Sequence, residues 1–232
     1  MDYRIGKVAV LFLLLLQFTQ GAEWIVPDQH PTIQAALVVA VSGDVVLVRP
    51  GTYRENLNFL GKNVVLRGME GADATILDAR RGVGILIGPG GTVEGFTVEN
   101  AYGSFGAAVR VSGSGTVIRD NVFAGNEQEV GGFGAAIGGN GASPVIERNL
   151  FRDNSADDQH LSGVVCFVNT SSPLIVNNVF VSNPTRAINL TLPQESRPVV
   201  VNNTLVENSV GIRVDARVPT DQQILRNNIL FN

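Results

Sequence analysis

Four acidic side chains in two predicted loops form the first set of residues that could do chemistry. Glu127 and Glu129 lie in one loop, and Asp157 and Asp158 lie in another loop further along the chain. Two acidic loops that lie side by side can supply the several oxygen ligands that Ca²⁺ prefers. We therefore consider a calcium site here and predict no other cofactor, with a solvated acidic loop as the structural alternative.

A second set of residues comes from five similar segments that each read as a short strand. The segments begin at residues 106, 134, 163, 185 and 209, and their alignment gives one apolar column: Val109, Ile137, Cys166, Ile188 and Ile212. Because side chains alternate across a strand, the residue after each of these is expected to face outward. The outward residues that could bind a ligand are Arg110, Phe167, Asn189 and Arg213.

A recurring asparagine indicates the architecture that positions both sets. It follows a short apolar run in five blocks: Asn121, Asn149, Asn178, Asn203 and Asn228. The spacings are 28, 29, 25 and 25 residues, which is typical of a solenoid. Asparagine tolerates left-handed backbone and can hydrogen-bond its own turn, so we interpret these residues as structural rather than ligand-binding.

The pattern predicts an all-β solenoid of about seven coils, each with three short strands. The apolar residues three positions before and two positions after each bend asparagine, such as Ile118 and Phe123 around Asn121, should stack inside in two continuous rows. A short helix is expected near the N-terminus, with Thr32 as N-cap, apolar residues from Ile33 to Ala40 at helical spacing, and Gly43 as the stop. This helix would cap the first coil. The chain stops at 229–232 in mid-coil, so we expect an uncapped and incomplete C-terminus.

Composition and the N-terminal segment limit the location and the partners. Residues 1–21 predict a signal peptide, with Arg4 and Lys7 before an apolar run and small residues at Thr19 and Gly21. We therefore expect a secreted protein, extracellular or periplasmic, whose solenoid domain comprises residues 22–232. The net charge of −4 makes nucleic acid an unsuitable partner, and no later segment is long enough to span a membrane.

The repeats resemble the right-handed parallel β-helix of the pectate-lyase-like superfamily, over residues 24–232. The segments Ile-Val-Pro-Asp-Gln-His-Pro-Thr-Ile-Gln-Ala-Ala (25–36), Gly-Asp-Val-Val-Leu-Val (43–48) and Pro-Gly-Thr-Tyr-Arg-Glu-Asn (50–56) are similar to the start of pectin-methylesterase-type helices. The Gln-Asp-Thr-Leu-like and Asp-Phe-Ile-Phe-Gly-like blocks of those esterases are absent from the sequence. Esterase activity is therefore disfavoured.

The resemblance implies that the outer face of the third strand of each coil is a polysaccharide groove. The ring of Phe167 could stack on a sugar while Arg110 and Arg213 hold carboxylates or hydroxyls. The alternative is that loops 127–133 and 155–161 fold over the strand and bury Phe167. For catalysis we consider Arg213 as a base beside Asp215, although that carboxylate favours the charged arginine.

Two functional hypotheses follow. The first is a non-catalytic protein that binds polysaccharide along this face, and the second is a lyase or glycoside hydrolase that acts on an acidic polysaccharide.

Overall fold

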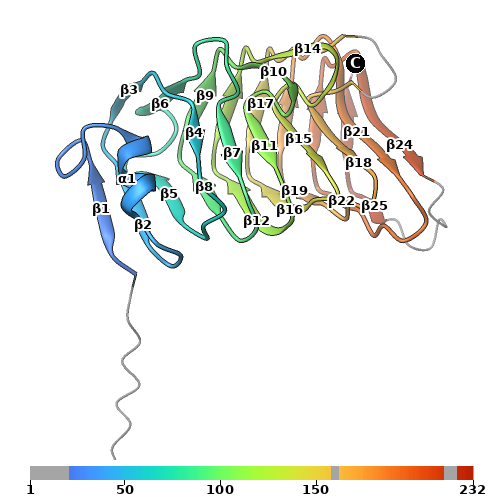
Figure 1. Ribbon diagram of the computed structural model, residues 1–232. Helices are drawn as coiled ribbons and strands as arrows, with labels where there is room; N and C mark the ends of the chain where they lie inside the picture. Colours follow the sequence, from blue (N-terminus) through green and yellow to red (C-terminus); the bar gives the residue numbers. More distant parts are fainter. Residues whose placement is uncertain (1–20, 158–161, 217–223, 232) are drawn as a thin grey trace, which may run out of the picture.

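The computed structural model describes residues 21–157, 162–216 and 224–231. In these residues short parallel strands stack into three long sheets, and the chain passes through each sheet in turn (Figure 1). The predicted β-helix with a short N-terminal helix is confirmed. The nine strands of the first sheet define about eight turns, one more than expected, because residues 23–26 before the helix also form a strand. The predicted signal peptide lies outside the described residues, except for Gly21.

The strands are grouped by sheet. The first sheet contains β1 (Glu23–Val26), β2 (Val45–Val48), β5 (Val65–Gly68), β8 (Thr92–Glu94), β12 (Ser114–Arg119), β16 (Ser143–Glu147), β19 (Leu174–Val176), β22 (Val199–Val201) and β25 (Ile224–Arg226). The second sheet contains β3 (Gly51–Tyr53), β6 (Thr75–Asp78), β9 (Thr97–Glu99), β13 (Val122–Ala124), β17 (Leu150–Arg152), β20 (Val179–Val181), β23 (Thr204–Val206) and β26 (Ile229–Phe231). The third sheet contains β4 (Leu57–Asn58), β7 (Ile85–Ile87), β11 (Val109–Val111), β15 (Ile137–Asn140), β18 (Val165–Val168), β21 (Arg186–Leu192) and β24 (Val210–Ala216). A separate pair, β10 (Tyr102–Phe105) and β14 (Glu127–Phe133), follows the second sheet in two adjacent turns.

The helix α1 (Ile33–Val39) covers the N-terminal end of the stack and is held at both of its ends (Figure 1). Thr32 is the N-cap, and its side chain accepts a hydrogen bond from the backbone of Ala35 at 3.1 Å. Glu55 accepts from the first two backbone N–H groups of the helix, both at 2.9 Å. Lys62 Nζ donates to three carbonyl groups at the other end at 2.7–2.9 Å. These charges match the helix dipole and fix the cap on the coil beneath it.

The predicted apolar rows fill the interior. In the first sheet Ile118 pairs with Ile146, which pairs with Ile175, and all three are fully buried. In the second sheet the rings of Phe123 and Phe151 stack at 5.1 Å, and those of Phe151 and Phe180 at 4.5 Å. One core therefore runs along the solenoid axis and holds the three sheets together.

Asparagines form two ladders inside the corners of the solenoid. In the first ladder each backbone N–H and each Nδ2 donates to Oδ1 of the next asparagine at 3.0–3.1 Å. Its members are the five residues of the sequence repeat: Asn121, Asn149, Asn178, Asn203 and Asn228. A second ladder at the corner after the second sheet links four further residues: Asn126, Asn154, Asn183 and Asn208. Because the side-chain amides at both corners are hydrogen-bonded from one coil to the next, they fix the spacing of the coils.

Among the residues that the structure describes, no helix has the length and apolar character needed to cross a membrane.

Candidate functional site

The outer face of the third sheet carries the residues that the sequence singled out for binding. This sheet faces the viewer in Figure 1, with β4 nearest to α1 and β24 furthest away. The strand register places seven outward residues in one column: Asn58, Leu86, Arg110, Gly138, Cys166, Asn189 and Arg213. Three of the four predicted binding residues are in this column. The fourth, Phe167, is not.

Phe167 faces the core, so its predicted role in binding is wrong. Val165 pairs with Ile137, whereas the sequence alignment placed Cys166 opposite Ile137. A slip of one residue exchanges the two faces of a strand. The ring is fully buried, and a Cβ built on Gly139 would lie 2.8 Å from it. The ring therefore occupies space that the glycine of the preceding coil leaves free.

Cys166 and Asn189 lie in the outward column but are also fully buried. Cys166 is buried, as predicted. Its side chain, however, lies on the outer face of the sheet and not on the predicted inner face. Asn189 Nδ2 donates to the carbonyl of Ser162 at 2.9 Å, so the chain before β18 lies over this part of the sheet. Burial raises the pKa of the Cys166 thiol to about 12, although the nearby Arg186 opposes the shift. Asn189 is therefore not accessible to a polysaccharide, which corrects its assignment as a binding residue.

Arg213 and Asp215 lie at the far end of the same sheet, on β24. Their side chains form an ion pair of 3.5 Å and are 31% and 49% exposed. In this partly solvated pair the guanidinium of Arg213 donates to the carboxylate of Asp215 on the same strand. Arg213 is also separated from Arg110 by the three buried positions of the column. The two arginines are thus not parts of one continuous exposed row.

A groove lies over the N-terminal part of the sheet, on β4, β7 and β11. Its volume is about 310 Å³. The described residues that line it are Asn58, Gly61, Leu86, Ile87, Gly88, Pro89, Arg110 and Ser112. Leu86 and Pro89 give it an apolar surface, while Asn58, Arg110 and Ser112 supply hydrogen-bonding groups. The combination of an apolar surface with a few polar groups is typical of a ligand site.

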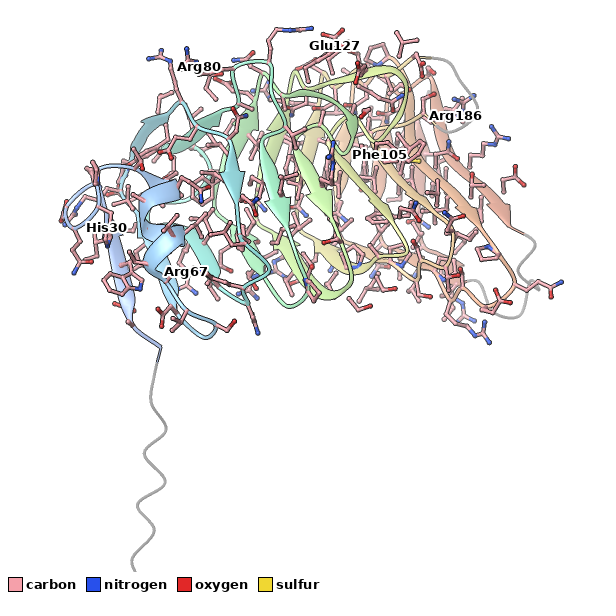
Figure 2. All side chains as sticks on the ribbon, in the orientation of Figure 1. His30, Arg67, Arg80, Phe105, Glu127 and Arg186 are labelled. Carbon is pink, nitrogen blue, oxygen red and sulfur yellow. The ribbon has the colours of Figure 1, made fainter. Side chains whose placement is uncertain are left out.

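Arg110 is the charged residue of this groove lining, and its position is fixed by the adjacent strand pair β10–β14. Its Nε donates to the carbonyl of Phe105 at 2.8 Å, and its guanidinium carbon lies 5.8 Å from the centre of that ring. The ring of Phe105 packs edge-to-face on Phe133 at 4.1 Å, and Figure 2 shows Phe105 beside the third sheet. Because Nε is occupied, the terminal nitrogens of Arg110 are the donors left for a ligand.

Of the eight described lining residues, the sequence singled out Arg110 alone, and three of the others have side chains that point to the groove's binding character: Asn58, Leu86 and Ser112. The sequence alignment that defines the outward column begins with the segment at residue 106 and does not include the two earlier coils. The strands at 57–58 and 85–87 are short, and their flanking turns differ from those of the later coils. Extending the period-two alternation back by two coils would have identified Asn58 and Leu86.

Two of the four acidic side chains proposed as calcium ligands, Glu127 and Asp157, make contacts within the protein. Glu127 pairs with Arg81 at 2.8 Å, on the edge where Figure 2 labels Glu127. Asp157 accepts hydrogen bonds from Gln128 at 3.0 Å and from the backbone of Gly131 at 2.7 Å. No group of three or more potential metal ligands is found among the described residues. Glu129 is exposed, and Asp158 lies outside the described residues, so the calcium site stays a prediction.

Comparison with known families agrees with this fold. Residues 63–232 match the model of the family described as "Right handed beta helix region". This match covers more than half of the chain, and the protein therefore belongs to that family. A search of curated proteins gave no match.

Two solved structures are similar in outline. One is a pectin methylesterase from Aspergillus niger, with 12% identity, a TM-score of 0.42, and coverage of 90% of this chain and 85% of that chain. The other is a pectin methylesterase in complex with a hexasaccharide, with 14% identity, a TM-score of 0.32, and coverage of 90% and 70%. Similarity at this level carries no argument about this protein.

Proposed function

We propose that the protein binds polysaccharide in the groove over β4, β7 and β11, and that this binding does not include catalysis. The observation that carries the proposal is the composition of the groove, in which an apolar surface at Leu86 and Pro89 adjoins three polar side chains. A sugar ring has the matching character, with C–H groups on its faces and hydroxyl groups around its edge. The apolar side chains would contact a ring face, and the polar ones would fix its orientation.

The available hydrogen-bonding groups come from β4 and β11, the two strands that flank β7, and from the residue that follows β11. Asn58 uses Oδ1 to accept from the backbone of Leu60 at 2.7 Å, which leaves its Nδ2 for a ligand. Arg110 offers its terminal nitrogens, because its Nε is bound to Phe105. The Ser112 hydroxyl makes a long contact of 3.4 Å to the carbonyl of Ile87 and can reorient. Adjacent strands are about 4.8 Å apart and β7 lies between β4 and β11, so Asn58 and Arg110 are about 10 Å apart along the sheet and can contact successive parts of an extended chain.

Binding without turnover is favoured by the charges in the groove. Among its described lining residues there is one guanidinium and no carboxylate. Hydrolysis of glycosidic bonds commonly uses a pair of carboxyl groups, one as an acid and one as a base or nucleophile. The lyase alternative would use Arg213, which lies at the other end of the sheet in an ion pair with Asp215. Secretion belongs to the proposal as well, and it is supported by the N-terminal sequence pattern alone.

The test is a binding screen of residues 22–232 against neutral and acidic polysaccharides, followed by two matched variants. Arg110→Ala should weaken binding to the best polysaccharide at least about tenfold, or about 1.4 kcal/mol. Arg213→Ala on the same column should change it less than about twofold. Folding of each variant is checked by circular dichroism and by its unfolding midpoint. If no polysaccharide binds, or if Arg213→Ala has the larger effect, the proposal is wrong. Release of reducing ends or of unsaturated products would instead support the enzymatic alternative.

A further inference from the structure

A second cavity lies on a different side of the solenoid, at the corner between the first and second sheets. Its volume is about 280 Å³. The described residues that line it are Arg67, Gly68, Gly71, Glu94, Gly95, Arg119 and Asp120. A water molecule takes about 30 Å³ in the liquid, so the cavity has room for a larger group. It shares no lining residue with the groove on the third sheet.

Two arginines in this cavity are fixed by one shared carboxylate. The register places Arg67, Glu94 and Arg119 side by side on β5, β8 and β12. Arg67 Nε donates to one oxygen of Glu94, and Arg119 Nε donates to the other at 2.5 Å. Burial opposes ionisation of Glu94, but hydrogen bonds from both arginines outweigh it and hold the pKa of this carboxyl below its usual value. Glu94 is therefore a charged bridge with 10% of its side chain exposed.

The terminal nitrogens of both arginines remain available. Each guanidinium contacts Glu94 through Nε, and no contact of Nη1 or Nη2 is found for either residue among the described residues. The two side chains are 46% and 36% exposed. Guanidinium groups in a fixed orientation bind carboxylate, sulfate or phosphate oxygens through paired hydrogen bonds.

The neighbouring ion pairs on the same corner show the opposite arrangement. Arg148 donates from Nε and Nη2 to the two oxygens of Asp120 at 2.8 and 2.9 Å. Its Nη1 lies 2.9 Å from Glu147. Two carboxylates thus occupy one guanidinium there, whereas one carboxylate serves two guanidinium groups at Glu94. Asp120 also lines the cavity, but both of its oxygens are already bound to Arg148.

Glycines leave the cavity open beside the arginines. A Cβ built on Gly71 would meet nothing within 4 Å. Gly68 and Gly95 pack backbone against backbone, since a Cβ on Gly68 would lie 2.1 Å from the Gly95 carbonyl oxygen. Larger side chains at these positions would fill the space or separate the coils.

We propose that this cavity is an oxyanion site in which Arg67 and Arg119, held by Glu94, bind a carboxylate or a sulfate or phosphate group. The oxyanion can be a free ion or a substituent of a larger molecule such as an acidic polysaccharide. The proposal is independent of the groove on the third sheet, and either site can exist without the other.

The test uses residues 22–232 with inorganic sulfate, inorganic phosphate and a galacturonate trisaccharide as three separate probes. Backbone amide shifts of Gly68, Gly71 and Gly95 are followed by NMR during each titration. Saturable shifts confined to this corner with at least one probe are expected. Sulfate or phosphate alone would indicate a free-ion site, and tighter binding of the trisaccharide would indicate an acidic glycan. Absence of saturable shifts with all three probes would overturn the proposal.

Variants then separate the site from general charge effects. Arg67→Gln and Arg119→Gln should each weaken binding of the best probe at least about tenfold. Arg152→Gln removes the same charge from a surface ion pair with Asp153, outside the cavity lining, and should weaken binding less than about twofold. Equal losses in all three variants would mean non-specific attraction and would overturn the proposal. Because the glycine shifts are measured on the unsubstituted protein, the test survives if a variant does not fold.

Discussion

The two halves of the third sheet share one strand register but have different outer surfaces. In the open half, formed by β4, β7 and β11, the outward residues Asn58, Leu86 and Arg110 are exposed or partly exposed. In the covered half, formed by β15, β18 and β21, Gly138, Cys166 and Asn189 are buried. The covering chain is visible at Gly138, where a Cβ would lie 2.7 Å from the carbonyl oxygen of Phe133. Register therefore determines which way a side chain points, and loops determine whether it reaches solvent.

The largest expected effect is on stability and concerns Phe167, which the sequence alignment placed on the outer face of the sheet. Phe167→Ala should destabilise the protein by about 3–5 kcal/mol, because it empties a fully buried ring site in the covered half. Urea unfolding followed by circular dichroism gives the change in free energy. A loss below about 1 kcal/mol would place the ring outside the core and restore the original alignment.

The next prediction compares one position of the column in each half. Gly138→Ala puts a Cβ 2.6 Å from the backbone nitrogen of Gly106, and we expect a loss of about 1–3 kcal/mol from this overpacking. Leu86→Ala removes a partly exposed side chain and should cost less than about 1 kcal/mol. Both are measured by urea unfolding. Equal costs would show that the covering chain does not rest on Gly138.

The buried thiol gives a pH test of the covered half. Below about pH 9 the thiol is protonated in both states, so it contributes no pH dependence there. Between pH 9 and about 12 an unfolded thiol loses its proton while the folded one, whose pKa is raised to about 12, retains it. Stability should therefore fall with pH through this window more steeply in the unsubstituted protein than in Cys166→Ala. Thermal unfolding at several pH values measures the difference, and parallel curves would mean that Cys166 is open to solvent.

The smallest expected effect is at the far end of the sheet. Arg213→Ala breaks a partly exposed ion pair with Asp215, and such pairs contribute about 0–1 kcal/mol. We expect a change in unfolding free energy below about 1 kcal/mol. A much larger loss would mean that Arg213 supports the covered half rather than lying beside it.

The sequence predicted the repeated architecture well because the repeat is local. Asn121 and its equivalents mark the same bend in every coil, and Ile118 and Phe123 lie at fixed distances from that bend. The register of the strand after Gly163 is harder to predict, because this strand follows a loop whose length differs from that of the equivalent loop in the preceding coil. Without the bend as a reference, glycine was aligned with glycine, and the error of one residue reversed the faces of Cys166 and Phe167.

The candidate sites were less predictable because they depend on contacts between different parts of the chain. The groove needs Asn58 and Arg110 from coils whose turns are dissimilar, and it ends where Phe133 covers Gly138. The shared use of Glu94 by Arg67 and Arg119 depends on rotamers, which no spacing rule specifies. Alternation therefore predicts which side chains of the column point outward, but not which of them are exposed to solvent.

The most direct measurement is a crystal structure of residues 22–232 with the oligosaccharide that binds best in the screen. We expect sugar density over β4, β7 and β11, with a ring against Leu86 and hydrogen bonds to Asn58 and the terminal nitrogens of Arg110. Sugar bound over β21 and β24 beside Arg213, or along the acidic loops at Glu127 and Asp157, would contradict this expectation.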